Sequence, residues 1–139
     1  MAKWLVKTEP ETYSIHDLRR DEVSPWDGVR NALAQQHLRQ MEVGDEVLVY
    51  HSGKEKAIVG LTEVVREKYL DPTDERGRAV CVDLKFVESF RRPLPLSEIK
   101  SQPKLKDMQL VRISRLSVMP LTEAHWRLIV ELIGSEVAS

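Results

Sequence analysis

Short runs of β-branched, aromatic and apolar residues predict four strands along the chain. Residues 4–8 form the first. Residues 47–50 are apolar at odd and even positions alike, which predicts a strand covered on both faces. Residues 57–65 form a third strand, in which Gly60 indicates a bulge or a close approach. From Val80 apolar and polar residues alternate, which predicts a half-buried antiparallel strand.

Three polar residues that can act as N-caps each precede a segment predicted to be helical, and so mark the starts of three helices. Ser14, with an acid at the capping-box position three residues later, caps a short helix that runs to Arg20. Asn31 precedes a helix over residues 32–41, which the glycine after it then stops. Thr122 caps a last helix, whose apolar residues recur at i, i+3, i+4 and i+7.

The remaining segments connect these elements. Gly44 is the glycine expected to end the second helix, and residues 71–77 form a polar turn region. Residues 96–100 predict one helical turn after a proline-rich strand end. We interpret residues 110–118 as an extended segment that lines something polar, because charged and hydroxyl residues interrupt its apolar positions. Strands interspersed with short helices, without regular βαβ alternation, favour an α+β fold with a mixed sheet or a small barrel.

Length and composition describe a single globular domain over residues 1–139. Hydrophobic residues make up 42% of the chain and charged residues 31%, which excludes a disordered tail. No apolar run approaches the roughly 20 residues of a membrane span, and the N-terminus lacks a signal-peptide core. We therefore expect no membrane partner, and a cytoplasmic protein, or a nuclear one in a eukaryote. The single Cys81 lacks neighbours at metal-ligand spacing, so we expect neither a metal nor a cofactor.

Charge is balanced overall but not locally. The net charge of −1 argues against indiscriminate binding of nucleic acid, which depends on neutralising many phosphates. Residues 91–115, however, carry seven basic residues against two acids. This segment is compatible with holding a nucleic-acid backbone and equally with a solvated surface.

Residues 26–31 combine unusual side chains in six positions. The sequence Trp-Asp-Gly-Val-Arg-Asn places a large ring, an acid, a flexible glycine, a guanidinium and an amide side by side. Gly28 permits a turn that other residues resist, and Asn31 starts the helix that follows. A planar ring beside hydrogen-bonding groups suits a nucleobase, which stacks on aromatic side chains. The alternative is that Trp26 covers the core and Asp27 pairs with Arg30.

Four segments, in this order, resemble the EVE domain, a branch of the PUA-like superfamily. They are WLVKTEP at residues 4–10, WDGVRN at residues 26–31, Gly44-Asp45 followed by Tyr50-His51-Ser52, and RLSVMP at residues 115–120. The resemblance covers nearly the whole chain. Thr8 departs from the Ser expected there but keeps the hydroxyl. Residues 34–36, Ala-Gln-Gln, depart from an expected Ala-Arg-Asn-like run, which concerns local contacts rather than the fold.

The resemblance implies a PUA-like β-barrel with flanking short helices and a non-enzymatic reader of a modified base. Relatives in the superfamily, among them the YTH and SRA domains, take a modified base out of its strand into a pocket. The partner would be DNA or RNA carrying a methylated or hydroxymethylated base, bound by a monomer. Extruding a base costs a few kcal/mol, which stacking and hydrogen bonds to the base edge offset.

By the same resemblance we assign roles around this pocket. Trp26 would be a stacking wall and Asn31 an amide that reads the base edge. Lys7 and Thr8 would complete the polar rim at the end of the first strand. Tyr50, His51 and Ser52 would supply a second wall and further polar contacts. Ser117, Val118 and Pro120 would line the opposite side, where a methyl group of the base could be accommodated. Arg30 and Arg115 would contact phosphates.

Several of these residues also have a structural interpretation. Tyr50 could belong to the core, His51 could be a structural hydrogen-bonding residue, and Lys7 could only pair with Glu9. Ser117 could satisfy neighbouring backbone groups. We assign Trp4 and Trp126 to the core from their strand and helix context.

Two other functions stay open at this point. An enzyme acting on a base would use His51 and Glu9 as acid–base groups, although the chain lacks a phosphate-binding glycine loop and a nucleophile elbow. Two of Lys7, Glu9 and His51 within hydrogen-bonding reach would support that function. The third function is an interaction module that uses its surface alone, or a binder of a small planar metabolite. Binding of nucleic acid should weaken steeply with salt, whereas binding of a small neutral ligand should not.

Overall fold

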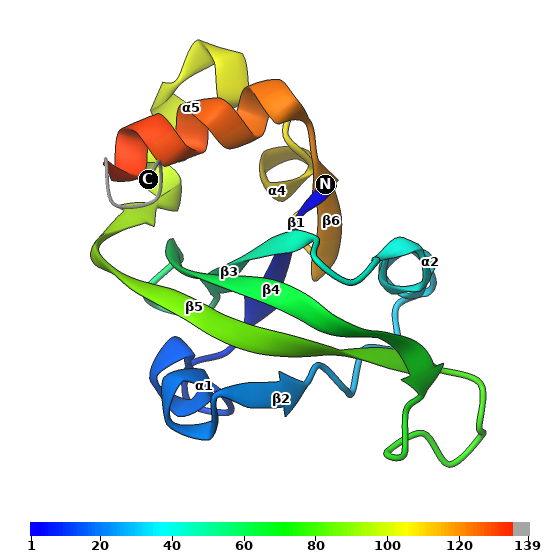
Figure 1. Cartoon of the computed structure of the whole chain (residues 1–139). Helices are drawn as coiled ribbons and strands as arrows, with labels where there is room; N and C mark the ends of the chain where they lie inside the picture. Colours follow the sequence, from blue (N-terminus) through cyan, green and yellow to red (C-terminus); the bar gives the residue numbers. More distant parts are fainter. Residues whose placement is uncertain (135–139) are drawn as a thin grey trace.

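Six strands form one mixed sheet in the order β2-β5-β4-β3-β1-β6 (Figure 1). The computed structural model describes residues 1–134. β1 (Lys3–Thr8) is parallel to β3 (Glu46–His51), and the other neighbouring pairs are antiparallel. β2 (Val23–Pro25) and β6 (Val118–Leu121) form the two edges. The expected α+β class and mixed sheet are confirmed, whereas this open strand order does not confirm a closed barrel.

The longest part of the sheet is the hairpin of β4 (Ala57–Leu70) and β5 (Val80–Pro95). Its pairing shifts register at several positions, and such bulges bend and twist a strand. The first shift includes Gly60, as the sequence predicts. A Cβ atom there would lie 2.5 Å from Cδ1 of Ile15 and 2.8 Å from the carbonyl oxygen of Glu88. Only glycine therefore allows α1 and β5 to approach this strand so closely.

The main helices begin at the predicted caps. These caps are Ser14 for α1 (Ile15–Asp21), Asn31 for α2 (Ala32–Gln40) and Thr122 for α5 (Glu123–Ile133). In each case the side-chain oxygen accepts a hydrogen bond from a backbone N–H in the first turn. Figure 1 shows α1 and α5 on opposite sides of the long hairpin. Among the described residues, no helix is long and apolar enough to cross a membrane.

Gly44 does not stop α2, so that prediction is wrong. The helix ends at Gln40, and Met41 follows it in an extended conformation. Gly44 instead lies in the turn that leads to β3, with a φ of 95° and its N–H bound to the carbonyl oxygen of Val64. The glycine is needed for that turn rather than for the helix end.

Residues 96–112 contain three short helical segments, which are α3 (Leu96–Ser101), η1 (Pro103–Leu105) and α4 (Gln109–Arg112). The predicted turn at residues 96–100 is confirmed, but the extended segment predicted for residues 110–118 is wrong. Local hydrogen bonds, among them Ile113 N–H to the carbonyl of Gln109, hold the chain in a turn. Leu110 and Leu116 are buried on either side of this turn, which explains its irregular apolar pattern.

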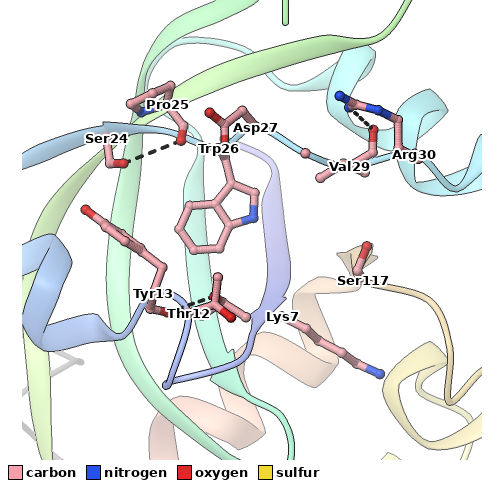
Figure 2. Close-up of a pocket in the computed structure, with 12 residues that line it drawn as sticks. Lys7, Thr12, Tyr13, Ser24, Pro25, Trp26, Asp27, Val29, Arg30 and Ser117 are labelled. Atoms are coloured by element: carbon pink, nitrogen blue, oxygen red, sulfur yellow. Dashed lines mark hydrogen bonds between the residues drawn. The ribbon is translucent and has the colours of Figure 1, made fainter. Parts of the chain in front are cut away.

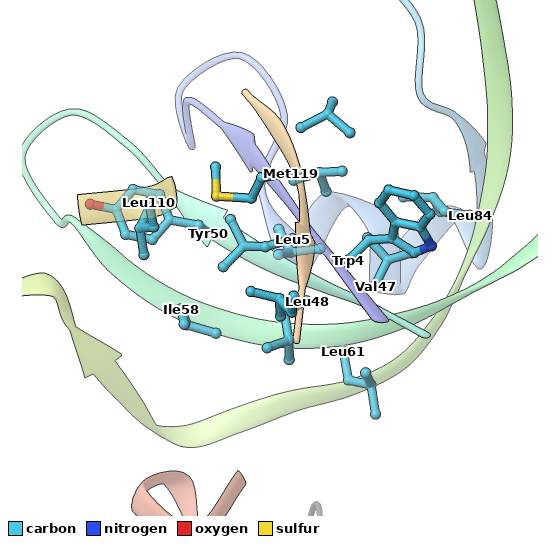
Figure 3. Packing of buried hydrophobic residues seen from close by; sticks show 14 of the residues in the cluster. Trp4, Leu5, Val47, Leu48, Tyr50, Ile58, Leu61, Leu84, Leu110 and Met119 are labelled. Carbon is cyan, nitrogen blue, oxygen red and sulfur yellow. The ribbon is translucent and has the colours of Figure 1, made fainter. Parts of the chain in front are cut away.

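The hydrophobic core is built around β1 and β3, whose central residues are buried on both faces (Figure 3). Trp4 and Trp126 are both buried, as expected. The indole N–H of Trp4 donates to Oδ2 of Asp45 at 3.0 Å, and the same carboxylate accepts from the backbone N–H of Glu42. Asp45 therefore joins β1 to the turn before β3, which gives the Gly44-Asp45 pair a structural role.

Candidate nucleobase site

A pocket of about 560 Å³ opens beside Trp26 (Figure 2). Four segments that are distant in sequence line it, namely residues 7–8 at the end of β1, residues 12–13, residues 24–30 and Ser117. Volumes of roughly 300–1,000 Å³ are typical of sites for small ligands. Of the predicted site residues, the fold brings five together here, which are Lys7, Thr8, Trp26, Arg30 and Ser117.

Trp26 belongs both to the core and to the pocket. Only 8% of its surface is exposed, and its backbone N–H donates to the carbonyl of Val82 on β5 at 2.7 Å. Its ring meets the ring of Tyr13 edge to face, with the centroids 6.3 Å apart and the planes at 80°. Figure 2 shows Trp26 between Tyr13 on one side and Lys7 and Ser117 on the other. Packing fixes the indole, and the part left accessible borders the pocket.

The loop after Trp26 is fixed by Asp71 from the turn between β4 and β5. Gly28, with a φ of 79°, donates its N–H to Oδ2 of Asp71 at 2.8 Å. Arg30 Nη1 donates to the same oxygen at 3.0 Å, and its Nη2 donates to Oγ1 of Thr73 at 3.0 Å. Burial raises the pKa of Asp71, but the hydrogen bonds from Thr73, Gly28 and Arg30 outweigh it and lower the pKa to about 2. The expected pair of Asp27 with Arg30 is replaced by Asp71 with Arg30.

Gln35, one of the departures from the family pattern, holds the same loop from the other side. Its Nε2 donates to the carbonyl oxygens of Val29 and Val80, and its Oε1 accepts from the N–H of Val80. The side chain is 8% exposed and its amide is well satisfied. Gln35 therefore joins the pocket loop to the first residue of β5.

Lys7 and Ser117 form the polar side of the pocket. The Lys7 ammonium donates to the carbonyl oxygen of Ser114 at 2.8 Å and lies 5.8 Å from the ring centroid of Tyr50. The Lys7 backbone N–H donates to the carbonyl of Ser117 at 2.9 Å, so Ser117 uses its backbone here and presents its side chain to the pocket. Burial lowers the pKa of Lys7. The partner of Lys7 is thus Ser114 rather than the expected Glu9.

Tyr50, His51 and Ser52 lie outside the residues that line this pocket. Tyr50 and His51 are 4% and 3% exposed. Nε2 of His51 accepts from the N–H of Ile15 at 3.0 Å, and its Nδ1 lies 2.8 Å from Oε1 of Glu55. Because Nε2 accepts a hydrogen bond, Nδ1 carries the proton and donates to Glu55. His51 therefore joins the end of β3 to the start of α1.

Four further predicted residues are also outside the lining of the pocket. Asn31 is exposed and uses its side-chain oxygen to cap α2, while Val118 is fully buried and pairs with Val6. Pro120 pairs with Trp4 in the sheet. Arg115 is exposed in the turn that precedes Ser117 and is not among the residues that line the pocket.

The sequence did not single out three polar or aromatic residues that do line the pocket, which are Thr12, Tyr13 and Ser24. Asp27, noted in the sequence as the acid beside Trp26 but given no contact, lines it as well. Tyr13 precedes the cap of α1, and its hydroxyl donates to Oδ2 of Asp21 at 2.7 Å. The one feature of the sequence that could have pointed to Tyr13 is its position after the first strand and next to the predicted cap of α1. Its proximity to Trp26, however, depends on the pairing of β2 with β5, which residue types do not reveal.

Metal and acid–base sites can be checked in the part of the chain that the structure describes. There, no group of three or more His, Cys, Asp or Glu side chains could hold a metal ion. Cys81 is buried, and burial raises the pKa of its thiol. Within residues 1–134, no hydrogen bond joins any two of Lys7, Glu9 and His51, which was the geometry expected of an enzyme.

Comparison with known proteins agrees with this architecture. The EVE domain family matches residues 2–132. Human thymocyte nuclear protein 1 is 34% identical over 94% of this chain and 73% of its own length. The solution structure of Rpa0253 from Rhodopseudomonas palustris is similar at 42% identity and a TM-score of 0.89, covering 98% of this chain and 94% of that one.

A second similar structure was solved with a ligand. It is the crystal structure of human thymocyte nuclear protein 1 in complex with DNA containing 5-methylcytosine. It is 34% identical to this chain, with a TM-score of 0.89, and the match covers 96% of this chain and 98% of that one. With the family match over residues 2–132, these similarities are decisive for the family. The chain belongs to the EVE domain family.

Proposed function

We propose that this protein is a non-enzymatic reader that takes a methylated or hydroxymethylated nucleobase of DNA into the pocket beside Trp26. The observation that carries the proposal is the pocket itself, with a fixed aromatic pair and polar side chains around about 560 Å³. The relative solved with DNA containing 5-methylcytosine supports DNA as the partner. RNA carrying a modified base is the alternative polymer that the PUA-like resemblance implies.

Trp26 and Tyr13 form an aromatic pair on which a base extruded from its strand can stack. Extrusion of a base costs a few kcal/mol, and stacking on an aromatic side chain recovers about 1–3 kcal/mol per base. Trp26 is fixed by its packing and by Tyr13, so little conformational entropy is lost when a base stacks on it. A pocket formed before binding favours recognition.

The polar side chains offer contacts to the edge of a base. Lys7, Thr8 and Ser117 supply donors and hydroxyl groups on one side, and Asp27 supplies an acceptor. A carboxylate accepts well from the exocyclic amino group of cytosine. This combination supports an amino-bearing base such as a modified cytosine over thymine or uracil.

The test is direct binding to a matched panel of oligonucleotides. DNA and RNA strands of one sequence, single and double, would carry unmodified, 5-methyl or 5-hydroxymethyl cytosine at one position. We expect tighter binding of at least one modified DNA than of its unmodified counterpart, measured by fluorescence anisotropy at two salt concentrations. Equal affinity for every modified and unmodified pair would overturn the proposal, and a preference confined to RNA would reassign the polymer.

A further inference from the structure

A second hollow, of about 340 Å³, lies between the β3–β4 turn and α3. Lysines 54 and 56 from the turn and Lys100 from α3 border it. The acid beside them, Glu55, accepts a hydrogen bond from Nδ1 of His51 at 2.8 Å and keeps its negative charge. None of the three lysines forms an ion pair with a described residue. Three lysines against one carboxylate leave the lining of the hollow with an excess of positive charge.

This hollow lies at the same edge of the sheet as the Trp26 pocket. β1 and β3 are parallel, so their C-terminal ends meet, with Thr8 beside His51. The N–H of Ser52 donates to the carbonyl oxygen of Thr8 at 2.9 Å, and Thr8 lines the Trp26 pocket. Lys54 is two residues beyond Ser52, a reach of at most about 7 Å between Cα atoms. The lysine turn thus begins at the border of the pocket.

The basic segment at residues 91–115 connects the two places along the chain. It includes Lys100 in the hollow and ends with exposed Arg115, between Ser114 and the pocket residue Ser117. The Ser114 carbonyl accepts the hydrogen bond from the Lys7 ammonium, so this end is fixed to the pocket. The remaining exposed cations between the two ends are Lys104, Lys106 and Arg112.

We propose that the Lys54, Lys56 and Lys100 hollow binds the phosphodiester backbone of the same strand whose modified base enters the Trp26 pocket. This inference rests on the proposed function, and it adds a second contact region to it. Lysine ammonium groups bind phosphates as point charges, without reading sequence. The hollow therefore contributes affinity and salt dependence but no preference among bases.

The sequence alone did not indicate this arrangement. Residues 91–115 contain Lys100, but Lys54 and Lys56 are more than 40 positions earlier in the chain. The hydrogen bond from the N–H of Leu96 to the carbonyl of Lys56 brings the β3–β4 turn to the start of α3. The two lysines of the turn thereby join a basic surface that is otherwise local in sequence.

The test compares two triple variants with the same change in charge. The first carries Lys54→Gln, Lys56→Gln and Lys100→Gln. The second, a control, carries Lys68→Gln, Lys85→Gln and Arg127→Gln, which are exposed residues outside both the hollow and the pocket. The dissociation constants for methylated and unmodified DNA are measured from 50 to 200 mM salt. Thermal unfolding checks that each variant is folded.

We expect the hollow variant to weaken binding of both DNAs equally, by tenfold or more at low salt. The slope of the logarithm of the association constant against the logarithm of the salt concentration should become shallower by up to about 2.7, at roughly 0.9 for each of the three lost phosphate contacts. The control should change both quantities much less. A hollow variant that behaves like the control would overturn this inference while leaving the base preference, and so the proposed function, intact.

Two more outcomes separate the proposals. Equal affinity of the wild-type protein for both DNAs, with binding still lost in the hollow variant, would overturn the base reader but support the backbone contact. Absence of DNA binding by the wild-type protein would overturn both. Because Lys56 has a positive φ of 48°, the pair Lys54→Gln and Lys100→Gln, which leaves Lys56 unchanged, repeats the test if the triple variant unfolds.

Discussion

Residues 26–31 and residues 50–52 look alike in sequence, since each places an aromatic ring beside polar side chains. In the structure they differ. Trp26 borders a pocket, whereas Tyr50 is buried and His51 has both ring nitrogens engaged, by Ile15 and Glu55. Ser52 uses its backbone N–H to hold Thr8. The first segment presents side chains to a cavity, and the second holds the elements around it in place.

The difference shows that residue types alone do not separate a candidate site from its support, because burial together with hydrogen-bond partners decides which side chains stay accessible. A histidine at a strand end could act on a ligand, but at 3% exposure with two partners His51 is a structural connection. Asp71 plays the same part for the pocket loop, through Gly28 and Arg30. Changes in the second segment should therefore alter stability alone, and changes in the first should alter binding, at Trp26 together with stability.

The largest effect is expected at Trp26. Trp26→Ala should lower the free energy of unfolding by about 3–5 kcal/mol, because the ring is 92% buried and its loss leaves a cavity. An alanine there would therefore disturb the fold as well as the pocket. Denaturant unfolding measures the loss, and a change below about 1 kcal/mol would contradict the packing described here.

Trp26→Leu separates binding from packing more cleanly. Leucine keeps an apolar side chain but removes the stacking surface, worth about 1–3 kcal/mol per base or roughly 5- to 150-fold in affinity. We expect that loss for modified DNA, measured by anisotropy on protein shown to be folded. Trp26→Phe, which keeps a ring, serves as the matched control and should retain more of the affinity.

At His51 the effect should be on stability instead. His51→Ala removes the acceptor of the Ile15 N–H and the donor to Glu55, and an unsatisfied buried group costs about 1–3 kcal/mol. The free energy of unfolding should fall by that amount, with the dissociation constant of the folded protein for modified DNA within about twofold of wild type. A large loss of affinity with unchanged stability would place His51 among the binding residues after all.

Asp71, which holds the pocket loop, should make the stability of the protein depend on pH. The folded-state pKa of Asp71 is lowered to about 2, below the value of about 3.9 for an unfolded aspartate. Its stabilising contribution is therefore present above about pH 4 and is lost as the pH falls toward 2. The loss should be about 2 kcal/mol. Denaturant unfolding between pH 5 and pH 2 measures it.

The control for this prediction is Asp71→Asn. That variant has no carboxyl group to titrate, so it should lose less stability than wild type between pH 5 and pH 2. Equal losses in the two proteins would show that other carboxylates, rather than Asp71, determine the acid sensitivity.

The smallest expected effect compares two serines. Ser117 presents its side chain to the pocket, and Ser52 does not. Ser117→Ala should weaken binding of modified DNA by about 2- to 10-fold, the value of one hydrogen bond, with little change in stability. Ser52→Ala should leave affinity unchanged. Equal effects of the two substitutions would remove the distinction between the segments.

Much of the fold could be predicted because the signals are local. Caps at Ser14, Asn31 and Thr122 depend on residues one turn away, and the alternation from Val80 reports on one strand. The turn at residues 113–117 was missed because its apolar residues follow no regular period, with Leu116 buried and Ile113 exposed.

The site was less predictable because its residues meet through long-range pairing. Trp26 was identified from residue type and family resemblance, but Tyr13 reaches it only through the packing of α1 and β2 beside β5. The hydrogen bond that occupies Nε2 of His51 likewise joins residues far apart in sequence, His51 and Ile15. Lys54, Lys56 and Lys100 are the same case at the surface.

The most direct test of the central claim is an NMR titration that follows the indole N–H signals of the three tryptophans. Trp4 donates its indole N–H to Asp45 in the core, so it reports on the fold, whereas Trp26 borders the pocket. Trp26→Phe assigns its signal by removing it. We predict that DNA with 5-methylcytosine shifts the Trp26 signal, that unmodified DNA shifts it less, and that the Trp4 signal stays in place. Tight binding of modified DNA with no change at Trp26 would contradict a base-reading pocket at this site.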